Sequence, residues 1–295
     1  MAVLLGLGAF LPAASAASAR VLTRTATAQV SGPSGSLGTA VARCPRGTAA
    51  ISGGYLTDFV FRQDGSGTAM LPYTSRRQGR RAWKVSAYTF GSGDPLTLTA
   101  RVNCAAGLGR LFTRKRHATA TGVGGNPMLR SVMAHCPRHS FALAGGFHYS
   151  VNGRATNPPD TPPVAMAFGS RAVARSWGVT VARQADGISQ VTAFAYCSKR
   201  RPMARHHSRL VRRRSGPPAS SSVSSPPCPD RSLPVSGGFT ARFPLFGGGQ
   251  FGLTIGSGLE TDGRWRMDGF PLSSQSPLNS IVYCLSDSQF SGSAG

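Results

Sequence analysis

The residues best placed to do chemistry are six regularly spaced cysteines. They stand at Cys44, Cys104, Cys136, Cys197, Cys228 and Cys284. Thiols form disulfides, ligate metals or act as nucleophiles, and their spacing separates these uses. There is no Cys-x-x-Cys pair, and the nearest histidines, His135 and His139, lack the second ligand pair of a structural zinc site. The cysteines therefore predict disulfides in an exported protein, with no metal and no cofactor.

The cysteine spacing indicates three tandem copies of one unit. Within successive pairs the gaps are 60, 61 and 56 residues, and the first member of each pair recurs every 92 residues. A fixed period of this kind is typical of repeated structure. Six cysteines allow fifteen pairings. The repeat favours Cys44–Cys104, Cys136–Cys197 and Cys228–Cys284, because any other pairing would treat equivalent copies unequally.

Other residues keep the same step. Each first cysteine is followed by a proline and, nine residues on, by a glycine pair with an aromatic after it; the pairs are Gly53-Gly54, Gly145-Gly146 and Gly237-Gly238. A tryptophan stands about twenty residues before each closing cysteine, at Trp83, Trp177 and Trp265. Glycine within a strand marks a bulge or a close backbone approach. We expect each tryptophan to be a core residue that packs over its glycine pair.

The elements that hold these residues read as short strands. Segments such as 83–88, 96–102 and 177–181 alternate large with small or polar residues at period two, and Gly- and Pro-rich turns separate them. The predicted fold class is all-β, with three tandem, small, antiparallel β-sandwich-like units that each contain one internal disulfide. The predicted boundaries are unit 1 at 22–106, unit 2 at 114–199, unit 3 at 206–287, and a flexible tail at 288–295.

The order of these motifs resembles a known kind of protein. Cys-Pro, then a Gly-Gly pair, then Trp, then a strand that ends in cysteine, such as Ala193 to Cys197, is similar to small secreted β-domains of actinobacteria that are largely uncharacterised. The similarity covers nearly all of the chain after its first residues, although each motif is short. It implies an extracellular location and brings no known catalytic residues.

Acids and histidines give no catalytic set. The aspartates Asp94 and Asp186 occupy matching turns, which is the ordinary place for this residue. Glu260 and Asp262 could form a glycosidase-like pair, but their glycine-flanked setting favours a hairpin loop. The Gly-x-Ser-x-Gly elbow of many serine hydrolases is absent. We therefore expect a protein that is not an enzyme, and a hydrolase with an unrecognised site is the weaker alternative.

The charge is one-sided, at a formal net +23 with 33 Lys and Arg against 10 Asp and Glu. Such a balance predicts attraction to polyanions, although an arginine-rich composition of the whole proteome would also explain it. The basic residues gather in the segments that we expect to connect the units. The predicted polyanion-binding residues are Arg114, Lys115, Arg116, Lys199, Arg200, Arg201, Arg205, Arg209, Arg212, Arg213 and Arg214. The alternative is a solvated linker.

The N-terminal segment predicts secretion. Residues 1–19 carry no charged side chain and combine a short apolar run with small residues, as in a signal peptide. We expect no transmembrane anchor after its removal, and a secreted or cell-wall-associated protein. The predicted function is non-enzymatic binding of an anionic cell-wall polymer or glycan. Nucleic acid, bound without sequence specificity, is a further predicted partner. A structural envelope protein without a specific ligand is the main alternative.

Overall fold

The computed structural model describes most of the chain, and the predicted signal peptide lies outside the described residues. The described ranges are 20–62, 67–91, 93–109, 111–122, 128–152, 165–183, 187–212, 220–241, 252–271 and 275–291. All statements about the structure refer to these residues.

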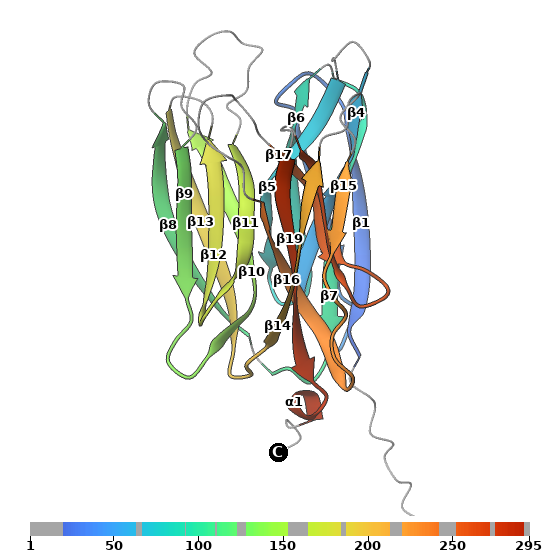
Figure 1. The fold of residues 1–295 in the computed structure, drawn as a ribbon, viewed down its shortest axis with the longest axis vertical. Helices are drawn as coiled ribbons and strands as arrows, with labels where there is room; N and C mark the ends of the chain where they lie inside the picture. The colour runs from blue at the N-terminus through green and yellow to red at the C-terminus, as the bar shows by residue number, and fades with distance from the viewer. Residues whose placement is uncertain are drawn as a thin grey trace, which may run out of the picture.

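The described chain is all-β except for one short helix near its end (Figure 1). Unit 1 contributes β1 (Leu22–Val30), β2 (Leu37–Arg43), β3 (Ala49–Thr57), β4 (Phe59–Phe61), β5 (Gly67–Gln78), β6 (Ala82–Gly91) and β7 (Leu96–Ala105). Unit 2 contributes β8 (Phe112–Gly122), β9 (Met128–His135), β10 (Phe141–Asn152), β11 (Ala165–Val173), β12 (Ser176–Arg183) and β13 (Gly187–Ser198). Unit 3 contributes β14 (Met203–Arg212), β15 (Ser221–Ser224), β16 (Ser232–Ala241), β17 (Gly252–Leu259), β18 (Trp265–Pro271) and β19 (Gln275–Ser286). The predicted tail begins with the helix α1 (Ser288–Ser291).

The strands form three antiparallel sheets, and each sheet is shared by two units. Sheet A has the order β1-β7-β3-β17-β18-β15, sheet B the order β2-β6-β5-β10-β13-β8, and sheet C the order β14-β19-β16-β11-β12-β9. Every unit is therefore a sandwich whose two layers belong to different sheets. Figure 1 shows the strands of unit 2, green to yellow, gathered on one side of the molecule. The predicted fold class is confirmed, and the sharing of sheets is an addition to it.

The units are joined by short strand pairings at three equivalent places. Strand β5 pairs with β10, β11 with β16, and β17 with β3. The aromatic residue after each glycine pair lies at this junction and is buried. The Tyr55 ring contacts both the Phe147 ring, at 6.0 Å between centroids, and the Phe239 ring, at 6.5 Å. These three rings bring the units together in one continuous core.

The two glycines of each pair have different roles. The first lies under the tryptophan of its own unit, as predicted: a Cβ at Gly53 would stand 2.4 Å from the Trp83 ring. The second lies against the backbone of the neighbouring unit, and a Cβ at Gly146 would stand 2.3 Å from the carbonyl oxygen of Ser75. The indole nitrogen of each buried tryptophan donates a hydrogen bond to a serine on an adjacent strand, as in Trp83 to Ser75 at 3.0 Å. The prediction of core tryptophans is confirmed.

The three predicted disulfides are all present, and no cysteine is free. In each unit the bridge joins a cysteine that follows the second strand to a cysteine in the last strand. In unit 1, for example, Cys44 follows β2 of sheet B and Cys104 lies in β7 of sheet A. Each bridge therefore links the two layers of one sandwich.

Candidate functional site: the basic face of sheet B

The predicted basic residues lie mostly in edge strands rather than in free connectors. Arg114, Lys115 and Arg116 are exposed on β8, the edge of sheet B. Arg205 is exposed on β14, the edge of sheet C, and the side chains of Arg209 and Arg212 on the same strand lie outside the described set. Lys199, Arg200 and Arg201 form the turn between β13 and β14, whereas Arg213 and Arg214 lie outside the described residues. The strand portions of the two runs lie in different sheets, since β8 is an edge of sheet B and β14 an edge of sheet C.

The first strands of the three units carry arginines at equivalent positions. Arg24 pairs with Val102, Arg114 with Ala195 and Arg205 with Val282, and each of these partners pairs in turn with the first glycine of its unit. Arg116, which stands one 92-residue step after Arg24 in the sequence, is displaced by two residues from this structural equivalence. Charged side chains on edge strands prevent pairing with other chains. Part of the basic excess therefore has a structural explanation.

A different basic surface is built on the outer face of sheet B. Directly paired residues on neighbouring strands point to the same face of a sheet. Arg76 on β5 pairs with Lys84 on β6, and Lys115 on β8 pairs with Phe194 on β13. Gly146 on β10 lies between these two pairs and pairs with Phe194. Because this glycine has no side chain, Arg76 reaches across it, and its guanidinium carbon lies 5.5 Å from the centre of the Phe194 ring.

The next row across the same face is polar. His148 on β10 shares a hydrogen bond with Thr74 through Nδ1, at 2.7 Å between Nδ1 and Oγ1. His117 on β8 has the same relationship with Thr192, at 2.8 Å. In each imidazole the nitrogen bonded to the threonine hydroxyl is Nδ1, and Nε2 is not used in these bonds. We call the surface of Arg76, Lys84, Lys115, His117, His148 and Phe194 the basic face.

The basic face has a consistently positive electrostatic character. Burial lowers the pKa of His148, and the nearby charges of Arg76, Lys84 and His117 lower it further. The described strands of sheet B contain no aspartate or glutamate to offset these groups. An arrangement of cations around a half-buried aromatic ring is suited to an anionic chain, because multivalent cations hold the charges and the ring contacts apolar portions.

The corresponding face of sheet A is neutralised. Arg266 on β18 occupies the place that Lys84 has in sheet B, directly after the core tryptophan. Its guanidinium binds Asp268 at 2.7 Å and Glu260 at 3.3 Å. Glu260 and Asp262 lie in the hairpin turn between β17 and β18, where Asp262 pairs with Arg264. The hairpin interpretation of these acids is confirmed, and their carboxylates are engaged with arginines.

No cluster of three or more potential metal ligands occurs among the described residues. His135 instead shares a hydrogen bond with Ser176, and Cys136 is held in its disulfide. Within the described part of the chain, no helix has the length and apolar character needed to cross a membrane. The three disulfides indicate an oxidising environment such as the extracellular space.

Comparisons with known proteins do not indicate a function for this site. A scan against protein-family models gives no match, and a search of curated proteins finds no relative. Function is therefore inferred from the geometry of the basic face. Of the basic face, only Lys115 was predicted from the sequence; the residues missed are Arg76, Lys84, His117, His148 and Phe194, which come from five different strands. The alternation in Trp83-Lys84-Val85 already indicates that Lys84 points away from the core.

Proposed function

We propose that this protein is a non-enzymatic, secreted component of the cell envelope or extracellular space that binds anionic wall polymers or glycans. The observation that carries the proposal is the basic face of sheet B, where cations from several strands surround Phe194. Such a surface attracts an extended polyanion and offers it several contacts at once.

The basic face supports this function better than the edge strands do. Arg76 and Lys84 are half-buried and fixed by neighbouring strands, so they lose little conformational freedom on binding. The edge-strand arginines are exposed and also protect the sheet edges, which gives them a role without any ligand. Of the cations on β8, Lys115 belongs to the basic face, whereas Arg114 and Arg116 alternate to the opposite face of the sheet.

The alternative is a structural envelope protein without a specific ligand. The shared sheets, three disulfides and continuous core favour a durable extracellular protein in either case. The two functions differ in polymer binding at physiological salt, which is expected of the binding protein and not of the structural one.

Affinity chromatography on immobilised polymers tests the proposal. We expect retention on poly(glycerol phosphate) and on polygalacturonate, elution with rising salt, and no retention on neutral dextran. A DNA column serves as a comparison for charge alone. Elution from all columns at low salt would favour the structural alternative, and tighter retention on DNA than on either wall-type polymer would redirect the function towards nucleic acid.

A further inference from the structure

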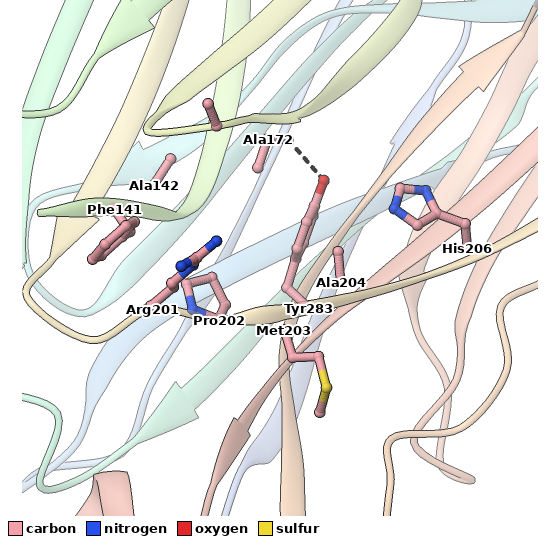
Figure 2. Close-up of a pocket in the computed structure, with 10 residues that line it drawn as sticks. Phe141, Ala142, Ala172, Arg201, Pro202, Met203, Ala204, His206 and Tyr283 are labelled. Carbon is pink, nitrogen blue, oxygen red and sulfur yellow. Dashed lines mark hydrogen bonds between the residues drawn. The ribbon is translucent and has the colours of Figure 1, made fainter.

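A second surface feature is a cleft at the junction of units 2 and 3, between β10 of sheet B and β11, β14 and β19 of sheet C. It has a volume of about 580 Å³ (Figure 2), which is within the range of small-molecule sites, roughly 300–1,000 Å³. The cleft is lined by Phe141, Ala142, Ala172, Ala174, Arg201, Pro202, Met203, Ala204, His206 and Tyr283. None of these ten residues belongs to the basic face.

The cleft exists because one position differs between equivalent units. Arg77 and Ala172 each pair with the core tryptophan of their unit. Each also donates its backbone N–H to the hydroxyl of the tyrosine that precedes a closing cysteine, over 2.7 Å to Tyr196 and 2.8 Å to Tyr283. Between units 1 and 2, the Arg77 side chain lies over the Tyr196 ring, with 5.8 Å from its guanidinium carbon to the ring centre. At Ala172 the chain has no such side chain, and the space beside Tyr283 is left open.

The third equivalent position is also filled. Leu259 pairs with Trp265 in unit 3, as Arg77 pairs with Trp83. Leu259 is buried and belongs to an apolar cluster that Val21 packs against. Two of the three junctions are therefore occupied by a large side chain of the protein itself, and the junction of units 2 and 3 is open.

The lining determines which ligand the cleft suits. The alanines at 142, 172 and 204 give a narrow apolar floor, and none of the ten lining residues is acidic. Arg201 and His206 are exposed, and the Arg201 guanidinium is held 5.6 Å from the centre of the Phe141 ring. Figure 2 shows Arg201 and His206 on opposite sides of Tyr283. A planar guanidinium fixed in this way is well suited to bind a carboxylate or phosphate through paired hydrogen bonds.

We propose that this cleft binds a single anionic sugar unit, a ring bearing a carboxylate or phosphate, with Arg201 holding the anion and the alanine floor contacting the ring. The choice of a sugar rests on the proposed function, since a unit of the same polymer would enter the cleft. The ring lies where Arg77 lies in the equivalent junction.

Titration of the full chain by NMR with glucuronate, glucose 6-phosphate, glucose and benzoate tests this site. We expect saturable shifts of the Ala172 and Ala204 amides with the two sugar acids. Glucose lacks the anion and benzoate lacks the hydroxylated ring, so each should bind at least about tenfold more weakly. The two acids also distinguish a carboxylate from a phosphate as the preferred anion.

The variant Ala172→Arg restores the side chain that fills the equivalent junction. It should keep the melting temperature and lower the sugar-acid affinity at least about tenfold. Ala106→Arg adds the same charge at an exposed turn outside the cleft and should bind like the parent. Arg201→Ser is a second test that does not depend on how Ala172→Arg packs, and it should also remove binding.

Unchanged sugar-acid binding in Ala172→Arg and Arg201→Ser would overturn the inference, as would the absence of any shift with either acid. Benzoate binding as tightly as glucuronate would overturn the assignment to a sugar. Retention on polymer columns is measured separately: if it persists without sugar-acid binding, only the cleft inference fails. If the sugar acids bind the cleft but no polymer is retained, the cleft inference stands and the proposed function of the basic face fails.

Discussion

The indole of Trp83 lies so close to Gly53 that a Cβ on this glycine would stand 2.4 Å from the indole Cγ. The same relationship recurs in unit 2 and unit 3, at 2.1 Å between a Cβ on Gly145 and the Trp177 ring and 2.0 Å between a Cβ on Gly237 and the Trp265 ring. Real Cβ atoms do not approach other atoms so closely. The glycine is therefore required by the packing of the tryptophan.

Gly53→Ala should destabilise the protein. The added methyl group must displace both the indole and the opposing backbone oxygen of Arg101, and overpacking of this kind costs about 1–3 kcal/mol. Urea denaturation measures the change in the free energy of unfolding. Gly178→Ala is the matched control, because its Cβ would make ordinary contacts of 3.5 Å or more. Equal stability of the two variants would contradict the packing argument.

Tyr55→Phe should leave the protein as stable as the parent or more stable. The Tyr55 hydroxyl is buried without a hydrogen-bond partner among the described residues, and the equivalent residues, Phe147 and Phe239, have no hydroxyl. A buried, unpaired hydroxyl costs about 1–3 kcal/mol. Tyr149→Phe is the contrasting variant, because its hydroxyl donates to the Pro72 carbonyl at 2.7 Å and its removal should destabilise by about 1 kcal/mol. A loss of stability in Tyr55→Phe would show that its hydroxyl is satisfied.

Removal of one disulfide should lower the stability of all three units together. Cys136 and Cys197 are 61 residues apart, for which chain entropy suggests about 4 kcal/mol. Because the sheets are shared, Cys136→Ser paired with Cys197→Ser should shift a single calorimetric transition to lower temperature. Two resolved transitions, with one unchanged from the parent, would mean that the units unfold independently.

Acidification should weaken the fold through His148. Its pKa in the folded protein is lowered from the ordinary value of 6.5, so below this value the unfolded chain binds the proton more readily. The free energy of unfolding therefore falls as the pH falls through this region. Well above pH 6.5, His148 is neutral in both the folded and the unfolded chain and does not change this free energy. Urea denaturation at about pH 7.5 and about pH 5 measures the loss. His148→Asn should lose less stability on acidification than the parent, and an equal loss in both proteins would contradict this assignment.

The repeat made much of the fold predictable. Equivalent cysteines, glycine pairs and tryptophans mark equivalent positions, so the disulfides and the packing of Trp83 over Gly53 follow from spacing and from strand alternation. The pairing of β17 with β3 could not be predicted, because it joins residues about two hundred positions apart through a short contact with no local signal, such as Ser257 with Tyr55. The role of Gly54 against the neighbouring unit depends on this same pairing.

The candidate site was only partly predictable for a related reason. A run of basic residues such as 114–116 is visible in the sequence, whereas the basic face gathers single residues from separate strands. Arg76 meets Phe194 only because Gly146 lies between them in the folded sheet. The cleft beside Tyr283 likewise required the comparison of Ala172 with Arg77, whose equivalence becomes clear only from the strand register.

The salt dependence of polyanion binding decides whether the basic face is the binding site. A labelled poly(glycerol phosphate) is titrated with the parent, with Arg76→Ser/Lys84→Ser/Lys115→Ser, and with Arg46→Ser/Arg81→Ser/Arg138→Ser. The last variant removes the same charge from exposed turns. Each lost contact should lower the slope of log affinity against log salt by about 0.7–0.9, so the basic-face variant should lose about 2–3 from the slope while the control keeps the parent value. Equal slopes for all three proteins, or an equal loss in both variants, would contradict a polyanion site on the outer face of sheet B.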